Sequence, residues 1–394
     1  MEIKQKESEY LIRLCSAYLS GTKISLDNTI DYQGIYLLAK SHNLTPTLFC
    51  VINTAENKKA VPKDIFTLFE EDFYDAVARY DFQQQKIDEL DEILTEAEIR
   101  HIFFKGAEIK EYFPVPQARV MGDIDILIDE KNRERVKALL IRNGYKATDY
   151  NGPVYNYVKD NVLTEMHTRI ISGKVGNADA EECFLDAMDN AVYKNMTGRL
   201  RESYHLAYLI THLAHHFWFY GAGIKLIMDL AVFQNRFDID YTVLMKKLSE
   251  VGLERFARVV LTVCFKWFGE GKDYGLDTEQ TEQFLISFGA FGNVNRSAAA
   301  VVQRKQLEEG KSASPLMLKM RLLFPSYEKM KNIDYMKFIE GRPYLTPAAW
   351  AYRLYYNLRY RKKFIKASTA GLGGSEVSDE AQKEMKYFEE IGLL

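Results

Sequence analysis

This chain has few cysteines and no excess of basic residues, and each of these two features excludes a class of protein. Among 394 residues there are only four cysteines, at positions 15, 50, 183 and 264, and no two of them form a C-x-x-C pair. Such spacing does not suit a disulfide framework or a structural zinc site, so we expect reduced thiols. The net charge of −3 argues against a dedicated nucleic-acid surface.

Long apolar runs are missing as well. No stretch of the sequence approaches 18 consecutive apolar residues, so we expect no membrane-spanning helix. The first ten residues, MEIKQKESEY, are charged and lack the apolar segment of a secretory signal. With reduced cysteines and neither of these segments, the sequence predicts a cytoplasmic protein. Its length suffices for two or three domains with packed cores.

Hydrophobic periodicity divides the chain into helical and mixed segments. Apolar residues recur at helical spacing before residue 99 and again from about 202 to 360, whereas short strands mixed with two helices lie between. Residues 172–198 are predicted to be a connection with one helical piece. A Gly- and Ser-rich linker then precedes a terminal helix capped by Ser378. We expect an α+β fold, a small mixed sheet flanked by N- and C-terminal helical regions, with boundaries 1–98, 99–171, 172–366 and 367–394.

Two aspartates stand either side of one isoleucine in the predicted strand GDIDILID. Because alternate residues of a strand share a face, Asp123, Asp125 and Leu127 lie on one face and three isoleucines on the other. The isoleucine face suits a core. Two carboxylates about 7 Å apart can straddle a divalent cation and the phosphates of a nucleotide. The pattern indicates a metal site, although a solvated acidic face has the same spacing.

The predicted strand NVLTEMHTRI also places acidic and basic side chains on one face. Glu165 and His167 share one of its faces, together with Leu163. If this strand lies beside the aspartate strand, Glu165 becomes a third carboxylate at the same site. Three carboxylates that hold two Mg²⁺ ions form the arrangement that in-line nucleotidyl transfer needs. We therefore predict that Asp123, Asp125 and Glu165 are metal ligands and catalytic residues on neighbouring strands.

Two motifs carry a family resemblance. The segment FFKGAEIKEYFPVPQARVMGDIDILI and the later TEMHTRI resemble the bacterial uncharacterised nucleotidyltransferase family, in the DNA-polymerase-β-like nucleotidyltransferase superfamily. The shared features are a Lys-Gly step, an aromatic-Pro step, an arginine, Asp-x-Asp and a later acidic-x-His strand. The resemblance extends over about residues 30–360, through HLAHHFWFYGAGIKLIMDLAVF. It implies a nucleotidyltransferase fold for the sheet domain and a metal-dependent reaction on a nucleoside triphosphate.

The first turn departs from the superfamily pattern. Gly106-Ala107, preceded by Lys105, stands where Gly-Gly or Gly-Ser is usual. Without the serine hydroxyl, contact with the γ-phosphate falls to Lys105, Arg119 or the backbone N–H groups of the turn. A guanidinium matches phosphate geometry, although a surface arginine in a Pro-bounded loop has the same sequence appearance. We predict that Lys105, Gly106 and Arg119 bind the nucleotide.

Histidines gather on a later helix. His212 and His216 are four residues apart and share a helix face. With Asp229 as a third ligand they could hold a transition metal, which is the pattern of a helical metal phosphohydrolase. No His-Asp dipeptide is present, however, and no glutamate lies between the two histidines. Packing or hydrogen bonding to substrate is the alternative.

The helix after the histidines carries two isolated charges. Lys225 and Asp229 are the only charged residues between positions 220 and 235, so the helix is predicted to be buried. A buried charge must be paired or used. These two side chains could pair with each other. In the alternative they line the nucleotide cleft, with Lys225 on the phosphates and Asp229, His212 or His167 as candidates for acceptor binding or general base.

The leading hypothesis is a nucleotidyltransferase that uses Mg²⁺ or Mn²⁺ to move a nucleotidyl group from a nucleoside triphosphate to an acceptor, releasing pyrophosphate. The acceptor could be a small molecule, a saccharide, a protein side chain or RNA. The alternatives are a non-catalytic nucleotide-binding member, favoured by Gly106-Ala107, and the phosphohydrolase. The basic and aromatic stretch YRLYYNLRYRKKFIK at 352–366 could contact an RNA backbone, although a solvated helix face is the commoner meaning.

Overall fold

In the computed structural model, four helices precede the first strand, as the helical spacing predicted. Asp31 caps the second by accepting hydrogen bonds from the backbone of Gln33 and Gly34, and Pro46 stands in the first turn of the third. The first helix packs against the third and against a later helix, α11. The four are α1 (Gln5–Ser20), α2 (Tyr32–Ser41), α3 (Thr45–Thr54) and α4 (Lys63–Glu96).

The structure describes residues 5–151, 153–176, 178–219, 221–289, 324–331, 334–360 and 375–394. They belong to two compact units. Met1–Gly292 together with Ile391–Leu394 form the first unit, and Asn293–Glu390 form the second.

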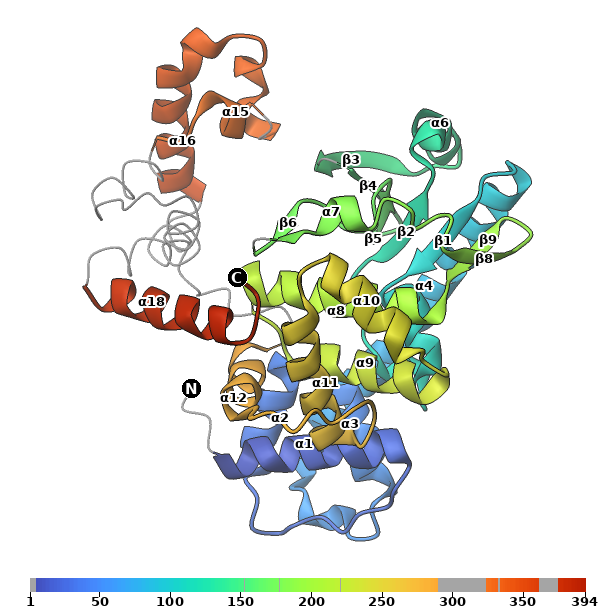
Figure 1. The fold of residues 1–394 in the computed structure, drawn as a ribbon, viewed down its shortest axis with the longest axis vertical. Helices are drawn as coiled ribbons and strands as arrows, with labels where there is room; N and C mark the ends of the chain where they lie inside the picture. The colour runs from blue at the N-terminus through green and yellow to red at the C-terminus, as the bar shows by residue number, and fades with distance from the viewer. Residues whose placement is uncertain are drawn as a thin grey trace. The chain divides into compact units, whose positions relative to one another are not determined.

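The first unit contains a seven-stranded mixed sheet, drawn in its upper part in Figure 1. Its order is β3-β4-β5-β2-β1-β9-β8. β2 runs parallel to β5 and β1 runs parallel to β9, whereas the other pairs are antiparallel. The strands are β1 (His101–Phe104), β2 (Ile124–Ile128), β3 (Lys146–Asn151), β4 (Val154–Lys159), β5 (Val162–His167), β8 (Ala191–Lys194) and β9 (Thr197–Leu200). The predicted α+β class is confirmed, with helical regions on both sides of the sheet.

The isoleucine face of β2 is core, as the alternation predicted. Ile124, Ile126 and Ile128 are at most 1% exposed, and they pack in one cluster with side chains from α4 and from α6 (Arg133–Arg142). The β4–β5 hairpin turns at Asp160 and Asn161, which both have positive φ, as a two-residue hairpin loop requires. The acidic face of β2 is consequently the face turned away from this core.

The connection predicted over 172–198 contains more structure than one helical piece. It holds a short hairpin, β6 (Lys174–Val175) and β7 (Ala178–Asp179), the short helix α7 (Ala180–Cys183) and strand β8. With β9 it extends the sheet beyond β1. The pairing of β9 with β1 joins residues far apart in sequence, which a local pattern does not reveal.

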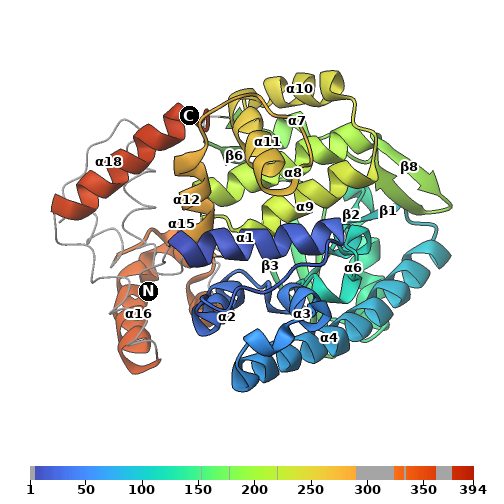
Figure 2. The ribbon, with the colours of Figure 1, turned by 90° about the horizontal axis from the view of Figure 1, so that it is seen from below.

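Helices follow the sheet. α8 (Glu202–Phe219) and α9 (Ile224–Arg236) lie side by side (Figure 2). α10 (Tyr241–Glu250) packs against α8 and α11 (Glu254–Phe268) against α9, and α12 (Glu279–Phe288) follows. This helical layer faces the acidic side of β2, because the Phe104 ring, paired in register with Asp125, contacts Tyr208 of α8.

The second unit contributes α15 (Tyr327–Met330) and α16 (Thr346–Tyr360), joined by two 3₁₀ turns, Asp334–Ile339 and Pro343–Leu345, and also α18 (Ser375–Glu390). The terminal helix starts at Ser375, so the expected cap Ser378 lies inside it. The predicted linker residues 367–374 lie outside the described residues. So do the last six residues of the basic stretch at 352–366.

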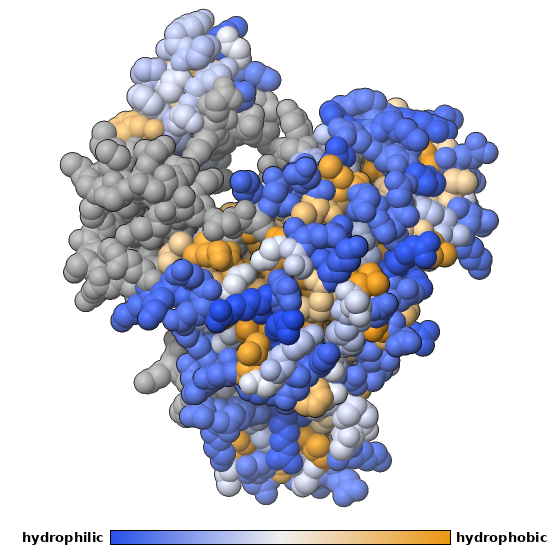
Figure 3. Space-filling view, in the orientation of Figure 1, coloured by the Kyte–Doolittle hydropathy of each residue, from blue (hydrophilic) through white to orange (hydrophobic). Residues whose placement is uncertain are grey.

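No described helix has both the length and the apolar character needed to cross a bilayer. Over the described surface in Figure 3, hydrophilic residues dominate and apolar residues form small groups among them.

Candidate active site

The site begins at the strained turn after β1. Lys105 has φ +51° and ψ −129°, an uncommon conformation for a residue with a side chain, and it immediately precedes the short helix α5 (Gly106–Ile109). Such a conformation costs on the order of 1–3 kcal/mol and persists only where the surrounding contacts hold it. Here Lys105 Nζ donates to Asp125 Oδ1 at 2.6 Å. The turn thus directs an ammonium group onto the acidic strand.

Asp125 and Glu165 are direct register partners on the parallel strands β2 and β5. The predicted adjacency of these strands, with both carboxylates on one face, is therefore confirmed. His167 Nε2 lies 2.9 Å from Asp125 Oδ1 and 3.3 Å from Glu165 Oε2. One donor atom from each of the three residues falls within 4.8 Å of the others, which is close enough for a shared cation. Among the described residues, this is the one such grouping of three.

Burial and neighbouring charge give the two aspartates different pKa values. Burial opposes ionisation of Asp125, which is 2% exposed, but the Lys105 ammonium and the His167 hydrogen bond outweigh it and lower its pKa to about 2. Burial raises the pKa of Asp123 to about 6, and the Asp125 carboxylate adds to this effect. Asp125 is therefore a permanent anion, whereas Asp123 ionises near neutral pH unless a cation joins it.

A buried ion pair connects the loop before β2 to helix α9. Arg119 Nε and Nη2 donate to the two carboxylate oxygens of Asp229 at 3.1 and 2.7 Å, and both side chains are 7% exposed. Bidentate geometry of this kind is the strong form of an arginine–carboxylate contact. The guanidinium also passes over Gly106, where an added Cβ would stand 2.8 Å from Arg119 Nη1. A side chain at position 106 would therefore displace the guanidinium from its present place.

Lys225 lies one helical turn before Asp229 on the same buried helix. Its Nζ donates to the backbone oxygen of Val120 at 3.3 Å. Burial lowers the pKa of Lys225 to about 7, Arg119 contributes to the decrease, and Asp229 and Asp123 oppose it. The two charges on α9 thus both reach the loop that leads into β2. The pairing of Asp229 with Arg119, rather than with Lys225 as the sequence allowed, could not be read from i, i+4 spacing.

Helix α8 presents its histidines toward the same space. His212 Nε2 and His216 Nε2 are 3.1 Å apart. Burial lowers the pKa of His216 to about 3 and that of His212 well below its ordinary value. Both imidazoles are therefore neutral at physiological pH. Within the described residues, these histidines and Asp229 do not form a three-ligand group, so the alternative of a transition-metal site at these histidines gains no support.

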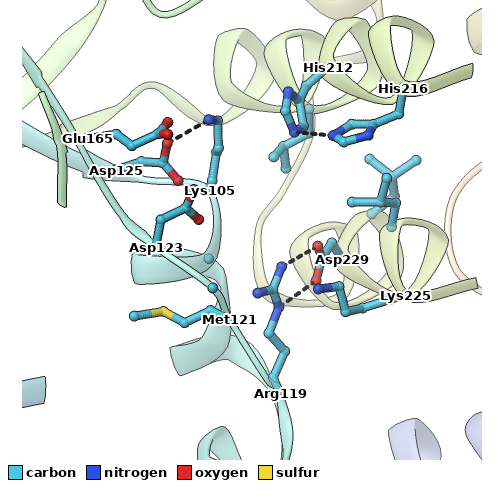
Figure 4. A pocket seen from close by; sticks show the side chains of 15 residues that line it. Lys105, Arg119, Met121, Asp123, Asp125, Glu165, His212, His216, Lys225 and Asp229 are labelled. Carbon is cyan, nitrogen blue, oxygen red and sulfur yellow. Dashed lines mark hydrogen bonds and ion pairs between the residues drawn. The ribbon is translucent and has the colours of Figure 1, made fainter. Parts of the chain in front are cut away.

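These side chains line one pocket of about 440 Å³, shown in Figure 4. The carboxylates project from the sheet side, and the histidines, Lys225 and Asp229 project from the two helices. Of the ten site residues predicted from sequence, His167 alone is not in the lining. It is buried and contacts the pocket residue Asp125. The lining is Lys105, Gly106, Arg119, Met121, Gly122, Asp123, Asp125, Glu165, Leu209, His212, His216, Lys225, Leu226, Asp229 and Leu230.

Sequence reasoning missed the apolar part of this pocket. Leu209, Leu226 and Leu230 carry no chemical signal and were indistinguishable from core residues. Tyr208 was also missed. It is fully buried, and its ring stacks on His212 with centroids 5.9 Å apart. Its position four residues before His212 on one helix face was the signal available.

Comparison with known proteins gives the family. No curated protein matches this chain. The family model described as uncharacterised nucleotidyltransferase matches residues 28–269, more than half of the sequence. The matched range contains the whole sheet and helices α8 and α9, hence every residue of the pocket. It ends well before residue 360, to which the resemblance was expected to extend. The chain belongs to the uncharacterised nucleotidyltransferase family.

Proposed function

We propose that this protein is a metal-dependent nucleotidyltransferase. An acceptor oxygen attacks the α-phosphorus of a nucleoside triphosphate, the bond from that phosphorus to the α–β bridging oxygen breaks, and pyrophosphate leaves. The observation that carries the proposal is the in-register pair Asp125 and Glu165, which faces basic side chains across a pocket of about 440 Å³. That volume is in the range of sites for one small ligand.

The donor set fits a divalent cation. Asp125 and Glu165 would hold Mg²⁺ or Mn²⁺, and Asp123, on the same face of β2, would join them once ionised. His167 supplies a nitrogen donor, or it fixes Asp125 from beneath. The cation would neutralise phosphate charge and polarise the reacting oxygens.

Three basic residues are suited to the triphosphate. Lys105 and Arg119 flank Gly106 in the pocket, and Lys225 lies on the opposite helix. The bidentate pair with Asp229 fixes the orientation of Arg119 before any ligand binds, so less ordering is needed at binding. This contact favours a positioning role for Asp229 over the role of general base, because the carboxylate is already engaged by a guanidinium.

The acceptor would approach from the α8 side. His212 is neutral, lies in the pocket lining, and can hydrogen-bond to a hydroxyl group of the acceptor. Leu209 of α8 and two leucines of α9, Leu226 and Leu230, leave part of the pocket lining apolar, which favours a neutral acceptor over a highly charged one.

The test is transfer of label. Protein incubated with each α-³²P-labelled nucleoside triphosphate, Mg²⁺ or Mn²⁺ and pools of candidate acceptors should release pyrophosphate and move label to one acceptor class. Glu165→Gln should abolish transfer, whereas Glu134→Gln, at an exposed carboxylate outside the pocket, should leave it unchanged. Transfer that persists in Glu165→Gln would contradict the proposal.

One contact favours the non-catalytic alternative. Lys105 Nζ already neutralises Asp125 at 2.6 Å, so the acidic strand is stable without a metal. A lysine in this position could bind a nucleotide without catalysing transfer. In that case nucleotide affinity is the same in Mg²⁺ and in EDTA, and no acceptor receives label.

A further inference from the structure

Charge is distributed unevenly along this chain. Residues 293–366 contain sixteen lysines and arginines against five aspartates and glutamates, a net charge of +11, while the whole chain has −3. The remaining residues therefore have a net charge of −14. Such asymmetry indicates a polyanionic partner for the basic segment, which the overall charge conceals. The segment lies entirely outside the family match at 28–269, so its partner need not be shared by the family.

The described part of this segment has a small core of its own. Met330, Met336, Ile339 and Ala349 are fully buried together. The indole of Trp350 donates to the backbone oxygen of Pro325 at 2.8 Å. These contacts anchor α16 by one side, at Ala349 and Trp350.

The opposite side of α16 carries exposed aromatic rings. Tyr352 and Tyr355 are 42% and 61% exposed and lie three residues apart, so they share a face. Arg359 continues this face one turn later and is also exposed. Tyr344, in the 3₁₀ turn before the helix, is 75% exposed, and the Phe338 ring contacts Tyr352 edge-on at 5.7 Å. Exposed rings gathered on one helix face form a candidate interaction surface.

We infer that this face of α16 binds single-stranded RNA. Aromatic rings interleaved with arginines form a platform on which unpaired bases stack, while Arg359 on the same face contacts a phosphate. The phenol hydroxyls can also hydrogen-bond to ribose 2′-hydroxyls, which DNA lacks. A helix that lies on a membrane would instead present leucine, phenylalanine or tryptophan along its buried face. Tyrosines and arginines on one face therefore favour nucleic acid.

The test is binding of the full-length protein to a labelled oligouridine of about 16 nucleotides, followed by fluorescence anisotropy in EDTA without nucleoside triphosphate. These conditions separate the inference from the proposed catalysis. Wild-type affinity should fall at least tenfold between about 50 and 200 mM salt. The double variant Tyr352→Ala/Tyr355→Ala should bind about tenfold more weakly or worse, because each stacking contact is lost.

Two variants complete the design. Tyr344→Ala should weaken binding on its own, and it keeps the inference testable if the double variant does not fold. Tyr74→Ala removes a ring of equal exposure, 61%, from α4 in the acidic part of the chain, and it should leave affinity unchanged. No binding by wild type, an equal loss in Tyr74→Ala, equal affinity for the matched deoxyoligonucleotide, or tighter binding to anionic phospholipid vesicles would each overturn the inference.

Discussion

At Asp123, burial and the neighbouring Asp125 carboxylate raise the pKa to about 6. A carboxylate whose folded pKa lies above its unfolded value stabilises the fold below the unfolded pKa, near 3.8, and loses that contribution as pH rises through 6. Above that pH, ionised Asp123 destabilises the metal-free protein. A bound cation would remove this loss of stability. Asp123 therefore fits the role of a cation ligand, because without a cation it destabilises the fold.

Asp123→Asn should therefore stabilise the metal-free protein at pH 8, by about 3 kcal/mol, and have little effect below pH 4. Denaturant unfolding in EDTA at several pH values measures this. Asp75→Asn, at an exposed position on α4, is the matched control and should leave the unfolding free energy unchanged both at pH 8 and below pH 4. Destabilisation by Asp123→Asn at pH 8 would contradict the assignment.

Gly106 and Gly122 offer a second test at single residues, because both line the pocket. A Cβ at Gly106 would meet Arg119 Nη1 at 2.8 Å and Met121 Cβ at 3.0 Å, whereas a Cβ at Gly122 has open space. Gly106→Ala should displace the guanidinium and weaken nucleoside triphosphate binding about tenfold or more, as expected for lost charge-assisted hydrogen bonds. Gly122→Ala should bind normally. Isothermal titration calorimetry compares the two, and equal affinities would refute the role of Arg119.

At the scale of elements, helix α9 joins the pocket to the loop before β2. Asp229 holds Arg119 and Lys225 holds the backbone of Val120, so one helix fixes the chain that leads into Asp123. Buried ion pairs contribute little net stability by themselves, because desolvation offsets much of their attraction. Their placement at a pocket therefore points to preorganisation of the site.

The protonation of Lys225 offers a way to measure whether α9 contacts the nucleotide. With a pKa of about 7, its amine is mostly neutral above that pH. Phosphate beside it would raise the pKa, so nucleotide binding should take up a proton, and affinity should fall as pH rises from 7 to 9. Calorimetry in buffers of different ionisation enthalpy detects the uptake. Lys225→Met should abolish it with little loss of unfolding free energy; a collapsed melting temperature with unchanged nucleotide affinity would contradict this prediction.

Strand alternation predicted the central elements because their signals are local. The apolar face of β2 and the β4–β5 hairpin follow from residues close in sequence, whereas the adjacency of Asp125 to Glu165 was predicted with the help of the family resemblance. The β1–β9 pairing and the Arg119–Asp229 contact do not follow from local signals, since their partners lie about 100 residues apart in sequence and only tertiary packing joins them.

The burial of Asp125 could not be predicted from the strand pattern. Its side chain is 2% exposed and is bonded to both Lys105 and His167. Removing its charge would leave the Lys105 ammonium without its closest anion. Glu165, with a side chain 21% exposed, is therefore the better residue for testing the metal site.

At the scale of the whole molecule, the chain carries two surfaces of opposite character in different parts of its sequence. The family-matched part holds the carboxylate pocket, and the basic segment beyond residue 292 holds the aromatic face of α16. Nucleotide binding and RNA binding are therefore expected to be separable. The proposed function depends on metal-dependent nucleotide binding.

The most direct test of that claim is calorimetric titration of ATP, GTP, CTP and UTP into the full-length protein, once with Mg²⁺ and once with EDTA. The account predicts that at least one nucleotide binds at least about tenfold more tightly with Mg²⁺, the effect of one charge-assisted contact or more. Glu165→Gln should lose this dependence on Mg²⁺, and Glu134→Gln should keep it. Equal affinity with Mg²⁺ and EDTA in the wild type, or full Mg²⁺ dependence in Glu165→Gln, would contradict the account.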